Sequence, residues 1–420
     1  MYKFGYIGYK LLLRLYRLKI VKKTSLAIVN ILSCLVPLND KRILFGSMNG
    51  RFYGDNSKYV YEWLLENRPD LAPVWMTASR EVFSTLKERG LPVAYTFSLK
   101  GLFYVLSAPL ALFTNSLRDI SIDPFSIPDR MMLISLRHGR SPKRVRFARL
   151  GHKITRLEEL ERNRESKLVQ YVISTSEFIS DIQEECLRVG REKHIVTGYP
   201  RNDKLFDPEA RDRIYFKDFT SDIDYRHVIL YAPTWRHGRD PVEFFPFKDF
   251  EVKRLIGFLE ENKILLLMRP HAGDLQYKNL NNFLNYLDLS SAYIKISRHD
   301  LFPDVNALLP FVNALICDYS ALYHDYLLLN RPIIFVPYDF DDFSSDNGFL
   351  YDYFKYLPGP VVTSLNCFIS ELKSVATGKD EYSDKRDILK NMVHGYSDDQ
   401  STLRVVKVLD KIRGSKSVKT

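Results

Sequence analysis

The sequence predicts an α/β protein with two doubly wound domains, each built on a parallel sheet. Short, continuous apolar runs recur from residue 41 onward, separated by stretches of helical length, which is typical of strands buried on both faces. The 420 residues are 45% hydrophobic, enough for one large or two ordinary cores. Polar residues follow strand after strand, where ligands of open parallel sheets bind.

The predicted strands form two sets on either side of the polar stretch 208–225. Those of the first set are Arg42–Phe45, Val74–Met76, Val93–Tyr95, Ala111–Phe113, Met132–Ile134, Val172–Ile173 and His194–Val196. Those of the second set are Val228–Tyr231, Ile264–Met268, Tyr293–Ile296, Leu315–Cys317, Ile333–Val336 and Val361–Val362. We therefore expect domains at 40–215 and 216–400, followed by a basic C-terminal tail at 401–420.

Residues 1–39 predict an amphipathic segment that lies on a membrane surface. They contain seven Lys or Arg residues and no acid, and those of the first 17 positions fall within one arc of a leucine-rich helix. The apolar run 25–36 is too short to span a bilayer, and no signal-peptide cleavage site follows it. A helix packed on the protein's own surface is the alternative. We expect a peripheral location at the cytoplasmic face of the membrane.

The formal net charge of +10 does not indicate a nucleic-acid partner. Between the two basic ends, 48 basic residues face 50 acidic ones, so the body of the chain is almost neutral. The exception is a cationic run at 138–153. Four cysteines without CxxC spacing predict neither a zinc site nor a disulfide framework, and a reducing compartment fits them best.

Arg269-Pro-His271 is the clearest candidate for a functional motif. It follows the strongly apolar run 264–268, and Pro270 ends that strand. Arg269 can grip phosphate oxygens with its fork of donors, and His271 can donate to an anion or exchange protons near neutral pH. A structural role is the alternative for a single histidine.

Two further segments of the second half place polar side chains after strands. Thr234 and Arg236 follow the run 228–231 and offer donors to an anion. Asp318-Tyr319-Ser320 follows the run 315–317, where Ser320 and nearby backbone amides suit a phosphate. Helix capping by Asp318 is an alternative that is compatible with phosphate binding.

In the first half, His138-Gly139-Arg140 with Lys143 follows the predicted strand near 132–136. Gly139 permits close approach of the backbone, and the cationic run beyond it suits an anionic acceptor or a lipid headgroup. A solvated basic loop is the alternative. Polar residues also follow strands at 47–56, which ends at Asn56, and at Thr114-Asn115-Ser116.

Several familiar catalytic and cofactor motifs are absent. The sequence contains no GxGxxG, GxxxxGK[ST], GxSxG or HExxH pattern, which argues against dinucleotide, P-loop, hydrolase and zinc-protease functions. The acidic turn Tyr338–Asp342 resembles the DxD element of metal-using sugar transferases, but such turns commonly cap helices. We expect no cofactor and no metal dependence.

Taken together, the motifs resemble the CDP-glycerol glycerophosphotransferase family of teichoic acid and capsule synthesis. The resemblance covers about residues 40–365. The matching elements, in family order, are Gly54–Asn56, Thr114–Ser116, His138-Gly139 with Lys143, Gly198–Asp203, Tyr231–Arg236, Arg269–His271, Asp318–Ser320 with Asp325, Pro332–Phe335, Tyr338-Asp339, Gly348-Phe349 and Pro358–Pro360.

The resemblance implies a GT-B fold, two Rossmann-like domains facing across a cleft, with the donor nucleotide in the C-terminal domain and the acceptor on the N-terminal side. It implies that His138 and His271 are catalytic. The donor-binding residues it implies are Thr234, Arg236, Arg269, Asp318, Tyr319, Ser320 and Asp325, and the acceptor-side residues are Asn56, Asn115, Gly139 and Lys143. The segment Arg137–Lys143 departs from the usual family sequence, as does Ala321, which leaves the acceptor open.

The function expected from the resemblance is transfer of glycerol phosphate, or a related alditol phosphate, from CDP-glycerol or a CDP-alditol to a hydroxyl of a membrane-linked acceptor, with release of CMP. His138 would be the base, and His271 would stabilise charge on the donor phosphates. The alternatives are a GT-B transferase or 2-epimerase acting on a nucleotide sugar, and a membrane- or nucleic-acid-binding protein without catalysis.

Overall fold

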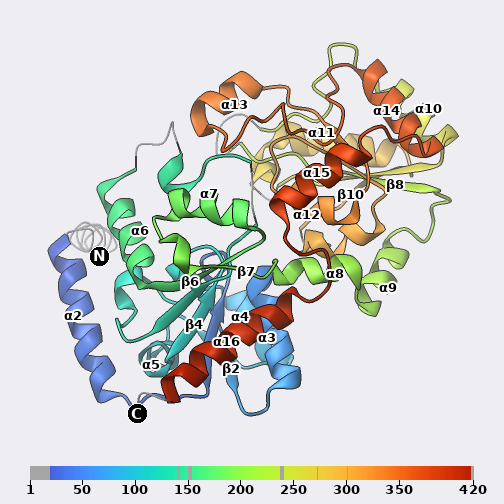
Figure 1. Ribbon diagram of the computed structural model, residues 1–420. Helices are drawn as coiled ribbons and strands as arrows, with labels where there is room; N and C mark the ends of the chain where they lie inside the picture. The colour runs from blue at the N-terminus through green and yellow to red at the C-terminus, as the bar shows by residue number, and fades with distance from the viewer. Residues whose placement is uncertain are drawn as a thin grey trace, which may run out of the picture. The chain divides into compact units, whose positions relative to one another are not determined.

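A computed structural model of the protein describes residues 19–139, 142–149, 154–236, 241–271, 273–299 and 301–417. It divides into two compact units, each with a parallel sheet between helices (Figure 1). The first unit comprises the described parts of 1–138, 153–201 and 400–420, and the second those of 139–152 and 202–399. The predicted α/β class with two doubly wound sheets is confirmed.

The first unit contains a seven-stranded parallel sheet in the order β3-β2-β1-β4-β5-β6-β7. Its strands are β1 (Arg42–Gly46), β2 (Ala72–Thr77), β3 (Val93–Tyr95), β4 (Leu110–Phe113), β5 (Met132–Ser135), β6 (Val169–Ser174) and β7 (His194–Val196). Its helices are α2 (Lys19–Leu35), α3 (Asp55–Asn67), α4 (Arg80–Glu88), α5 (Leu99–Ser107), α6 (Arg156–Leu168), α7 (Glu177–Leu187) and α16 (Ser401–Ser417).

The second unit contains a five-stranded parallel sheet in the order β10-β9-β8-β11-β12. Its strands are β8 (His227–Tyr231), β9 (Ile264–Met268), β10 (Ile294–Ile296), β11 (Ala314–Cys317) and β12 (Ile333–Phe335). Its helices are α8 (Asp203–Phe206), α9 (Ala210–Phe219), α10 (Val252–Glu261), α11 (Lys278–Ser290), α12 (Leu322–Tyr326), α13 (Phe340–Asn347), α14 (Leu365–Thr377) and α15 (Ser383–Val393).

The apolar runs in the sequence became strands because both faces of each sheet are covered. All five residues of β9 are buried, for example, and β1 and β4 are buried almost throughout. The predicted run 361–362 is the exception, since it forms only an isolated bridge between Val361 and Phe335. Two residues are too few to continue the sheet beyond β12.

The units do not divide where the sequence composition changes. The boundary lies between Arg201 and Asn202 rather than at residue 215. The polar stretch that we took for a linker contains α9, whose Phe216 stacks on Phe311 at 4.7 Å between ring centroids. This aromatic contact ties the stretch to the second unit.

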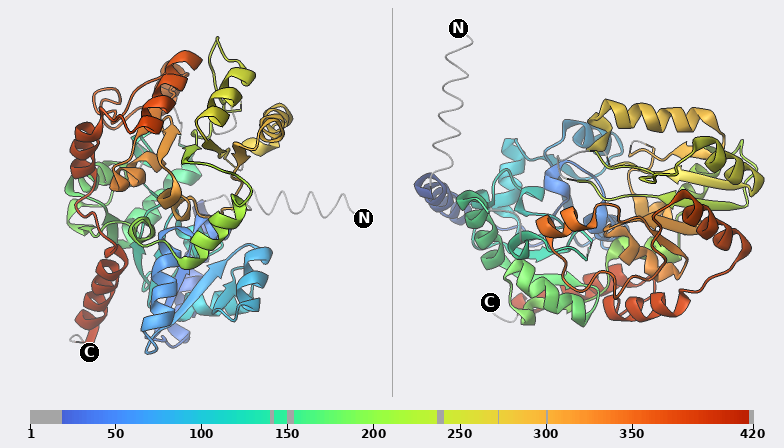
Figure 2. Two further views of the ribbon diagram at one scale, coloured as in Figure 1. Left: turned by 90° about the vertical axis from the view of Figure 1, so that its right-hand side faces the viewer. Right: turned by 90° about the horizontal axis from the view of Figure 1, so that it is seen from above.

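The predicted basic tail at 401–420 is instead, over its described part, the helix α16 of the first unit. Its apolar side chains Val405, Val406, Leu409 and Ile412 are buried in the core that contains β1 and α3. The helix lies alongside α3, as the views of Figure 2 show. Its lysines and arginines suggested a tail, but the spacing of its apolar residues is helical.

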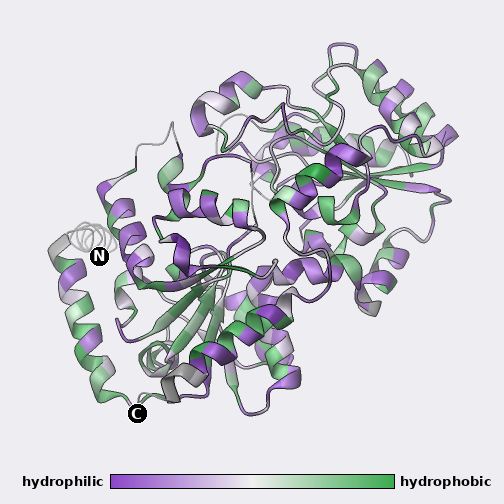
Figure 3. Cartoon of the chain, viewed as in Figure 1, coloured by the Kyte–Doolittle hydropathy of each residue, from purple (hydrophilic) through white to green (hydrophobic). Residues whose placement is uncertain are grey.

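The helix α2 is the described part of the predicted N-terminal segment, and it presents its apolar side to solvent. Lys22 is buried and pairs with Asp123, while Ile28, Ile31, Leu32 and Leu35 are exposed; Figure 3 shows the apolar residues of α2 in green. The amphipathic pattern that we identified before residue 19 lies outside the described residues. Among those described, no helix has the length and apolarity needed to cross a membrane.

Candidate active site

The first unit gathers polar residues where its strand order reverses, between β1 and β4. The Thr114 hydroxyl donates to Ser47 Oγ at 3.3 Å. Asp119 organises this edge by accepting the backbone N–H groups of Asn49, Thr114 and Asn115 at 2.6–2.9 Å. Burial raises the pKa of Asp119 to about 6, although these hydrogen bonds act in the opposite direction.

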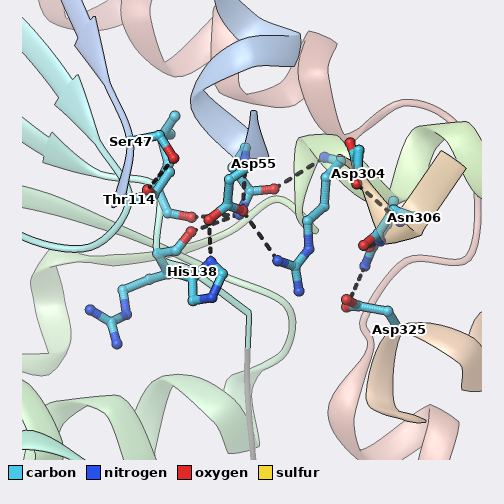
Figure 4. Close-up of polar contacts among 12 residues, drawn as sticks. Ser47, Asp55, Thr114, His138, Asp304, Asn306 and Asp325 are labelled. Atoms are coloured by element: carbon cyan, nitrogen blue, oxygen red, sulfur yellow. Dashed lines mark hydrogen bonds and ion pairs between the residues drawn. The ribbon is translucent and has the colours of Figure 1, made fainter. Parts of the chain in front are cut away.

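His138, just after β5, is held by an acid from the start of α3. Its Nδ1 pairs with Asp55 Oδ2, and Arg201 Nη1 lies 3.1 Å from the other carboxylate oxygen (Figure 4). The side chain of His138 is 48% exposed, whereas that of Asp55 is 3% exposed. Burial works to raise the pKa of Asp55, but His138 and Arg201 outweigh it and bring the pKa down to about 2.

This pairing determines which nitrogen of His138 can accept a proton. Because Asp55 is a carboxylate at any pH well above 2, the Nδ1 of a neutral His138 carries the hydrogen and donates it to Asp55. The lone pair then lies on Nε2, as a general base requires. Asp55 itself adopts a left-handed backbone conformation with φ of 60°, which its neighbours must stabilise.

Asn56, predicted on the acceptor side, connects three parts of the first unit instead. Its amide nitrogen donates to the carbonyls of Leu136 and Arg137 at 3.0 and 2.8 Å, and its oxygen accepts the Arg201 N–H at 3.1 Å. The side chain is completely buried. Asn56 therefore fixes the loop that carries His138 and is not exposed to a substrate.

The second unit repeats the arrangement where its own strand order reverses, between β8 and β11. The Thr234 N–H donates to Asp318 Oδ1 at 2.9 Å, which joins the two strand ends. Arg236 Nη1 lies 2.8 Å from the other carboxylate oxygen of Asp318. The structure thus brings together residues predicted from two separate motifs.

The guanidinium of Arg236 is enclosed by two acids and several aromatic rings. The Nε and Nη2 of Arg236 donate two parallel hydrogen bonds to the carboxylate of Asp339, at 2.7 and 2.9 Å. The rings of Tyr319, Tyr338 and Phe343 lie 5.2–5.4 Å away. Burial opposes the charge, but the acids outweigh it and raise the pKa of Arg236. In this structure the guanidinium of Arg236 pairs with Asp318 and Asp339, so its donors are engaged with the protein and not directed at a phosphate.

Arg269 is also engaged with the protein. It donates to the backbone carbonyls of Ser297 and Phe302 at 3.1 and 2.7 Å, and it is buried. Burial lowers its pKa to about 10, with Asp304 acting in the opposite direction. Arg269 therefore fixes the loop after β10, which differs from the predicted contact with the donor diphosphate.

His271 is exposed and held in a defined orientation. Its ring stacks on Trp235 with 4.9 Å between centroids and 8° between planes. Its Nδ1 accepts the Gly273 N–H at 3.0 Å, so a neutral His271 carries its hydrogen on Nε2. The hydrogen-bond roles of the ring nitrogens are therefore the reverse of those in His138.

Replacing Gly273 with alanine should disturb this arrangement. A Cβ there would lie 3.0 Å from the Trp235 ring and 3.2 Å from His271 Nδ1, so both rings would have to shift. We expect turnover to fall about tenfold or more, because small displacements of catalytic groups cost up to about 10²-fold. The control is Gly257→Ala, where a Cβ meets nothing within 4 Å. Equal turnover in the two variants would contradict a positioning role for Gly273.

Lys143, predicted on the acceptor side, belongs to the second unit. Its backbone bridges Phe349, and its ammonium lies 5.7 Å from the centre of the Phe343 ring. Burial lowers its pKa to about 8, although Asp318 acts to raise it, and Arg236 adds to the lowering. Gly139, also predicted on that side, begins the same segment in a left-handed conformation with φ of 57°.

Of the remaining residues predicted to bind the donor, one is partly exposed and two are buried. Ser320 is partly exposed and accepts the Leu322 N–H at 3.2 Å, at the start of the five-residue helix α12. Tyr319 is completely buried and stacks on Phe343 at 4.1 Å. Asp325 is also buried and accepts from Asn202 at 3.1 Å. In this structure the side chains of the last two contact other residues of the second unit, and their contact with a ligand stays a prediction.

Comparison with known proteins identifies the family. The sequence profile of the CDP-glycerol:poly(glycerophosphate) glycerophosphotransferase family matches residues 28–411, most of the chain. The chain belongs to this family. The resemblance seen in the motifs is thereby confirmed, and the protein is a glycerophosphotransferase-like enzyme. Alditol-phosphate transfer in teichoic acid synthesis is the function that its family supports.

Two curated relatives illustrate how this glycerophosphotransferase-like chain compares with the family. It is 26% identical over 392 residues to the teichoic acid glycerol-phosphate transferase of Staphylococcus aureus (strain NCTC 8325 / PS 47), covering 89% of this chain and 94% of that one. It is also 26% identical over 374 residues to the teichoic acid poly(glycerol phosphate) polymerase of Bacillus subtilis (strain 168). That match covers 86% of this chain but 47% of the polymerase, so the chain spans about half of it.

Solved structures show the same fold. The wall teichoic acid polymerase TagF is similar with a TM-score of 0.73 and 22% identity, covering 94% of each chain. The structure of a Listeria monocytogenes protein described as a UDP-N-acetylglucosamine 2-epimerase is similar with a TM-score of 0.54 and 11% identity. The match covers 89% of this chain and 96% of that one. The predicted GT-B class is thus confirmed at the level of the fold.

Sequence reasoning did not predict that Asp55 and Gly273 hydrogen-bond to the two histidines of this glycerophosphotransferase-like enzyme. Asp55 was present in a matching motif but had no assigned role, and Gly273 was not singled out. Asp339 was considered as part of a metal-binding pattern and of a family motif, but its pairing with Arg236 was not predicted. Asp119 was also missed, because it lies beyond Thr114-Asn115-Ser116 and not directly after β4.

Proposed function

We propose that the enzyme transfers glycerol phosphate, or a related alditol phosphate, from CDP-glycerol or a CDP-alditol to a hydroxyl of a membrane-linked acceptor, releasing CMP. The product would enter teichoic acid or capsular polysaccharide. The observation that carries the proposal is the opposite hydrogen bonding of the two histidines. The Nε2 of His138 is suited to accept a proton, and the Nε2–H of His271 is suited to donate a hydrogen bond. Transfer of a phosphoryl group from a diphosphate to a hydroxyl requires both a proton acceptor and a donor to the phosphates.

In the proposed reaction, the acceptor hydroxyl oxygen attacks the phosphorus that carries the alditol. Its proton passes to His138 Nε2 while the bond from phosphorus to the bridging oxygen of CMP breaks, and the electron pair leaves with CMP. A phosphodiester and CMP result. Asp55 holds the imidazole in orientation and stabilises the imidazolium that forms, and because its pKa is about 2 it stays ionised throughout.

His271 and Lys143 are proposed to act on the donor in the second unit. The Nε2–H of His271 would donate to a phosphate oxygen, with its ring orientation set by Trp235 and Gly273. Lys143 would supply positive charge, since Arg236 is already paired with Asp318 and Asp339. Phosphoryl transfer depends mainly on alignment and neutralisation of charge. We therefore propose that no resident metal is required.

The direct test is the nucleotide released. The enzyme is incubated with CDP-glycerol, CDP-ribitol or UDP-sugars and a synthetic lipid-linked acceptor, and CMP and UDP are quantified with and without chelator. We expect CMP from a CDP-alditol, and equal rates in chelator. UDP release would favour the nucleotide-sugar alternative, and the absence of any turnover would favour a binding protein. Loss of activity in chelator that magnesium restores would contradict metal independence.

The proposed role of Lys143 predicts a pH dependence. With a pKa of about 8, the free enzyme's lysine is charged below pH 8 and loses its charge above it. We therefore expect kcat/KM for CDP-glycerol to fall between pH 8 and 9. In Lys143→Arg the side chain stays charged, and the fall should disappear. The same decline in both proteins would rule out Lys143 as its source.

We also propose peripheral attachment to the cytoplasmic face of the membrane through residues 1–39. The support is the orientation of α2, in which Lys22 and Ser33 are buried against the protein. Asn30 exchanges hydrogen bonds of 2.8 and 2.9 Å with Asp129 while Ile31 and Leu35 are 64% and 74% exposed. An exposed apolar helix face beside basic residues is the pattern of an interfacial helix. The attachment would place the enzyme where a lipid-linked acceptor lies.

Attachment through α2 predicts that Ile31→Ser/Leu35→Ser moves the protein from the membrane pellet to the soluble fraction. Losing two inserted apolar side chains should lower partitioning about tenfold or more. The control, Ile388→Ser on α15, is matched to Ile31 because both are 64% exposed. If both variants sediment like the unmodified protein, α2 is not an anchor.

A further inference from the structure

The first unit carries a second exposed apolar surface, on α5 and the two residues before it. Phe97, Leu99, Leu102 and Phe103 are 63%, 87%, 38% and 46% exposed. Leu99, Leu102 and Phe103 have the spacing of one helix face. Four large apolar side chains exposed within seven residues form a patch of the kind that marks an interaction site, whereas single exposed apolar residues are ordinary.

The patch is held rigidly on the unit. Ser98 caps α5 by accepting the Gly101 N–H at 3.0 Å, and its hydroxyl donates to the Tyr95 carbonyl at 2.6 Å. At Gly101 a Cβ would come within 2.4 Å of the Tyr95 carbonyl oxygen, so the helix lies against that backbone. The exposed side chains are therefore presented by an ordered element and not by a mobile loop.

Cations surround the patch. Arg42 lies 5.3 Å from the centre of the Phe103 ring and 4.4 Å from that of Tyr104, and Lys100 lies 5.5 Å from the Tyr104 ring. Arg80 lies 5.9 Å from the Tyr95 ring. Within the described part of the chain, none of these three cations forms an ion pair with a carboxylate. Arg80 and Lys100 are exposed, so their charges are available to an external anion.

The helix that carries the patch is joined to the C-terminal end of α2 by hydrogen bonds. The Asn39 N–H donates to the Ser107 carbonyl at 2.9 Å. The Nη2 of Arg130 donates to the carbonyls of both Val36 and Leu106, at 2.8 and 2.6 Å. These bonds join the C-terminal ends of α2 and α5, so that two helices with exposed apolar faces belong to one rigid part of the first unit.

We propose that residues 97–103 form a second contact with an anionic lipid bilayer. Phe97, Leu99, Leu102 and Phe103 enter the boundary between headgroups and acyl chains, while Arg80 and Lys100 meet the headgroups. Apolar groups beside cations that have no carboxylate partner complement an anionic membrane better than they complement another copy of this surface, which would bring like charges together. The proposal rests on the membrane attachment proposed for α2. Two contacts on one rigid unit would also fix its orientation on the membrane.

The test uses the full-length enzyme and vesicles of phosphatidylcholine, with or without phosphatidylglycerol. We expect Leu99→Ser/Phe103→Ser to lower partitioning onto anionic vesicles about tenfold. We expect Arg80→Ala and Lys100→Ala to lower it roughly fivefold each, on anionic vesicles only. Leu289→Ser on α11 is the matched control, since Leu289 is 86% exposed and Leu99 87%. Such exposed positions tolerate substitution without unfolding.

The outcomes separate this proposal from the one it rests on. If Leu99→Ser/Phe103→Ser binds vesicles like the control while Ile31→Ser/Leu35→Ser does not bind, the α5 contact is wrong and the α2 anchor stands. If the enzyme binds no vesicle at all, both are wrong. If the α5 variant changes only the oligomeric state, measured by sedimentation, the surface binds a second copy and the lipid proposal is overturned.

Discussion

Replacing His138 with alanine is expected to lower turnover about 10²- to 10⁴-fold while CDP-glycerol still binds. General base catalysis contributes about that factor, and the variant loses the nitrogen that accepts the hydroxyl proton. Donor binding should survive because His271 and Lys143 belong to the other unit. Turnover is measured as CMP release and donor binding by calorimetry. Turnover close to that of the unmodified enzyme would remove His138 from the mechanism.

Asp55→Asn tests the same assignment through the partner. An amide can hold the ring in the wrong tautomer, by donating to Nδ1, so we expect a loss of about 10²-fold or more with little change in KM. The pH profile separates catalysis from structure, because loss of the carboxylate should also lower the apparent pKa of the base. If the variant lost activity only because part of it unfolded, the remaining folded enzyme would keep the apparent pKa of the unmodified enzyme.

The second large effect is expected in stability, from Arg236→Ala. The substitution leaves the carboxylates of Asp318 and Asp339 without their cation, in a place where Asp318 is almost completely buried. Removing one partner of a buried ion pair costs about 3–5 kcal/mol. Hydrogen exchange can localise the loss, which should appear as reduced protection in β8 and β11 and leave β1 and β4 unchanged.

The control for Arg236 is Arg254→Ala on the exposed side of α10, for which we expect a change below about 0.5 kcal/mol. Addition of Asp318→Asn to Arg236→Ala should recover part of the lost stability, because it removes one of the uncompensated charges. Unchanged protection together with a raised KM for the donor would instead support direct contact between Arg236 and the diphosphate.

The sequence predicted the strands of both sheets, but it did not predict the side-chain contacts between distant segments. Strands buried on both faces are continuous apolar runs, and residues that follow them necessarily meet at one edge, so Thr234 and Asp318 could be placed together. Contacts between distant segments left no such pattern. Asp55 lies 83 residues from His138, and Asp339 lies 103 residues from Arg236. A cation near a predicted phosphate site looks the same in sequence whether a ligand or a carboxylate neutralises it.

Charge also obscured structure at two places. The basic residues of 401–420 suggested a tail, although the spacing of Val405, Val406, Leu409 and Ile412 is helical and could have indicated a packed helix. Lys143 was grouped with His138 because they are five residues apart. The division between the compact units falls within that interval, immediately after His138, and sequence proximity cannot show this.

The burial of α16 in the first core has a consequence for biosynthesis. Residues 202–399 are translated before the helix that finishes packing around β1 and α3 has emerged from the ribosome. The second unit can therefore fold while the first unit still lacks the helix that completes its core. Ribosomal pausing, a premature stop codon or proteolysis near residue 400 would thus damage the part of the enzyme that was synthesised first.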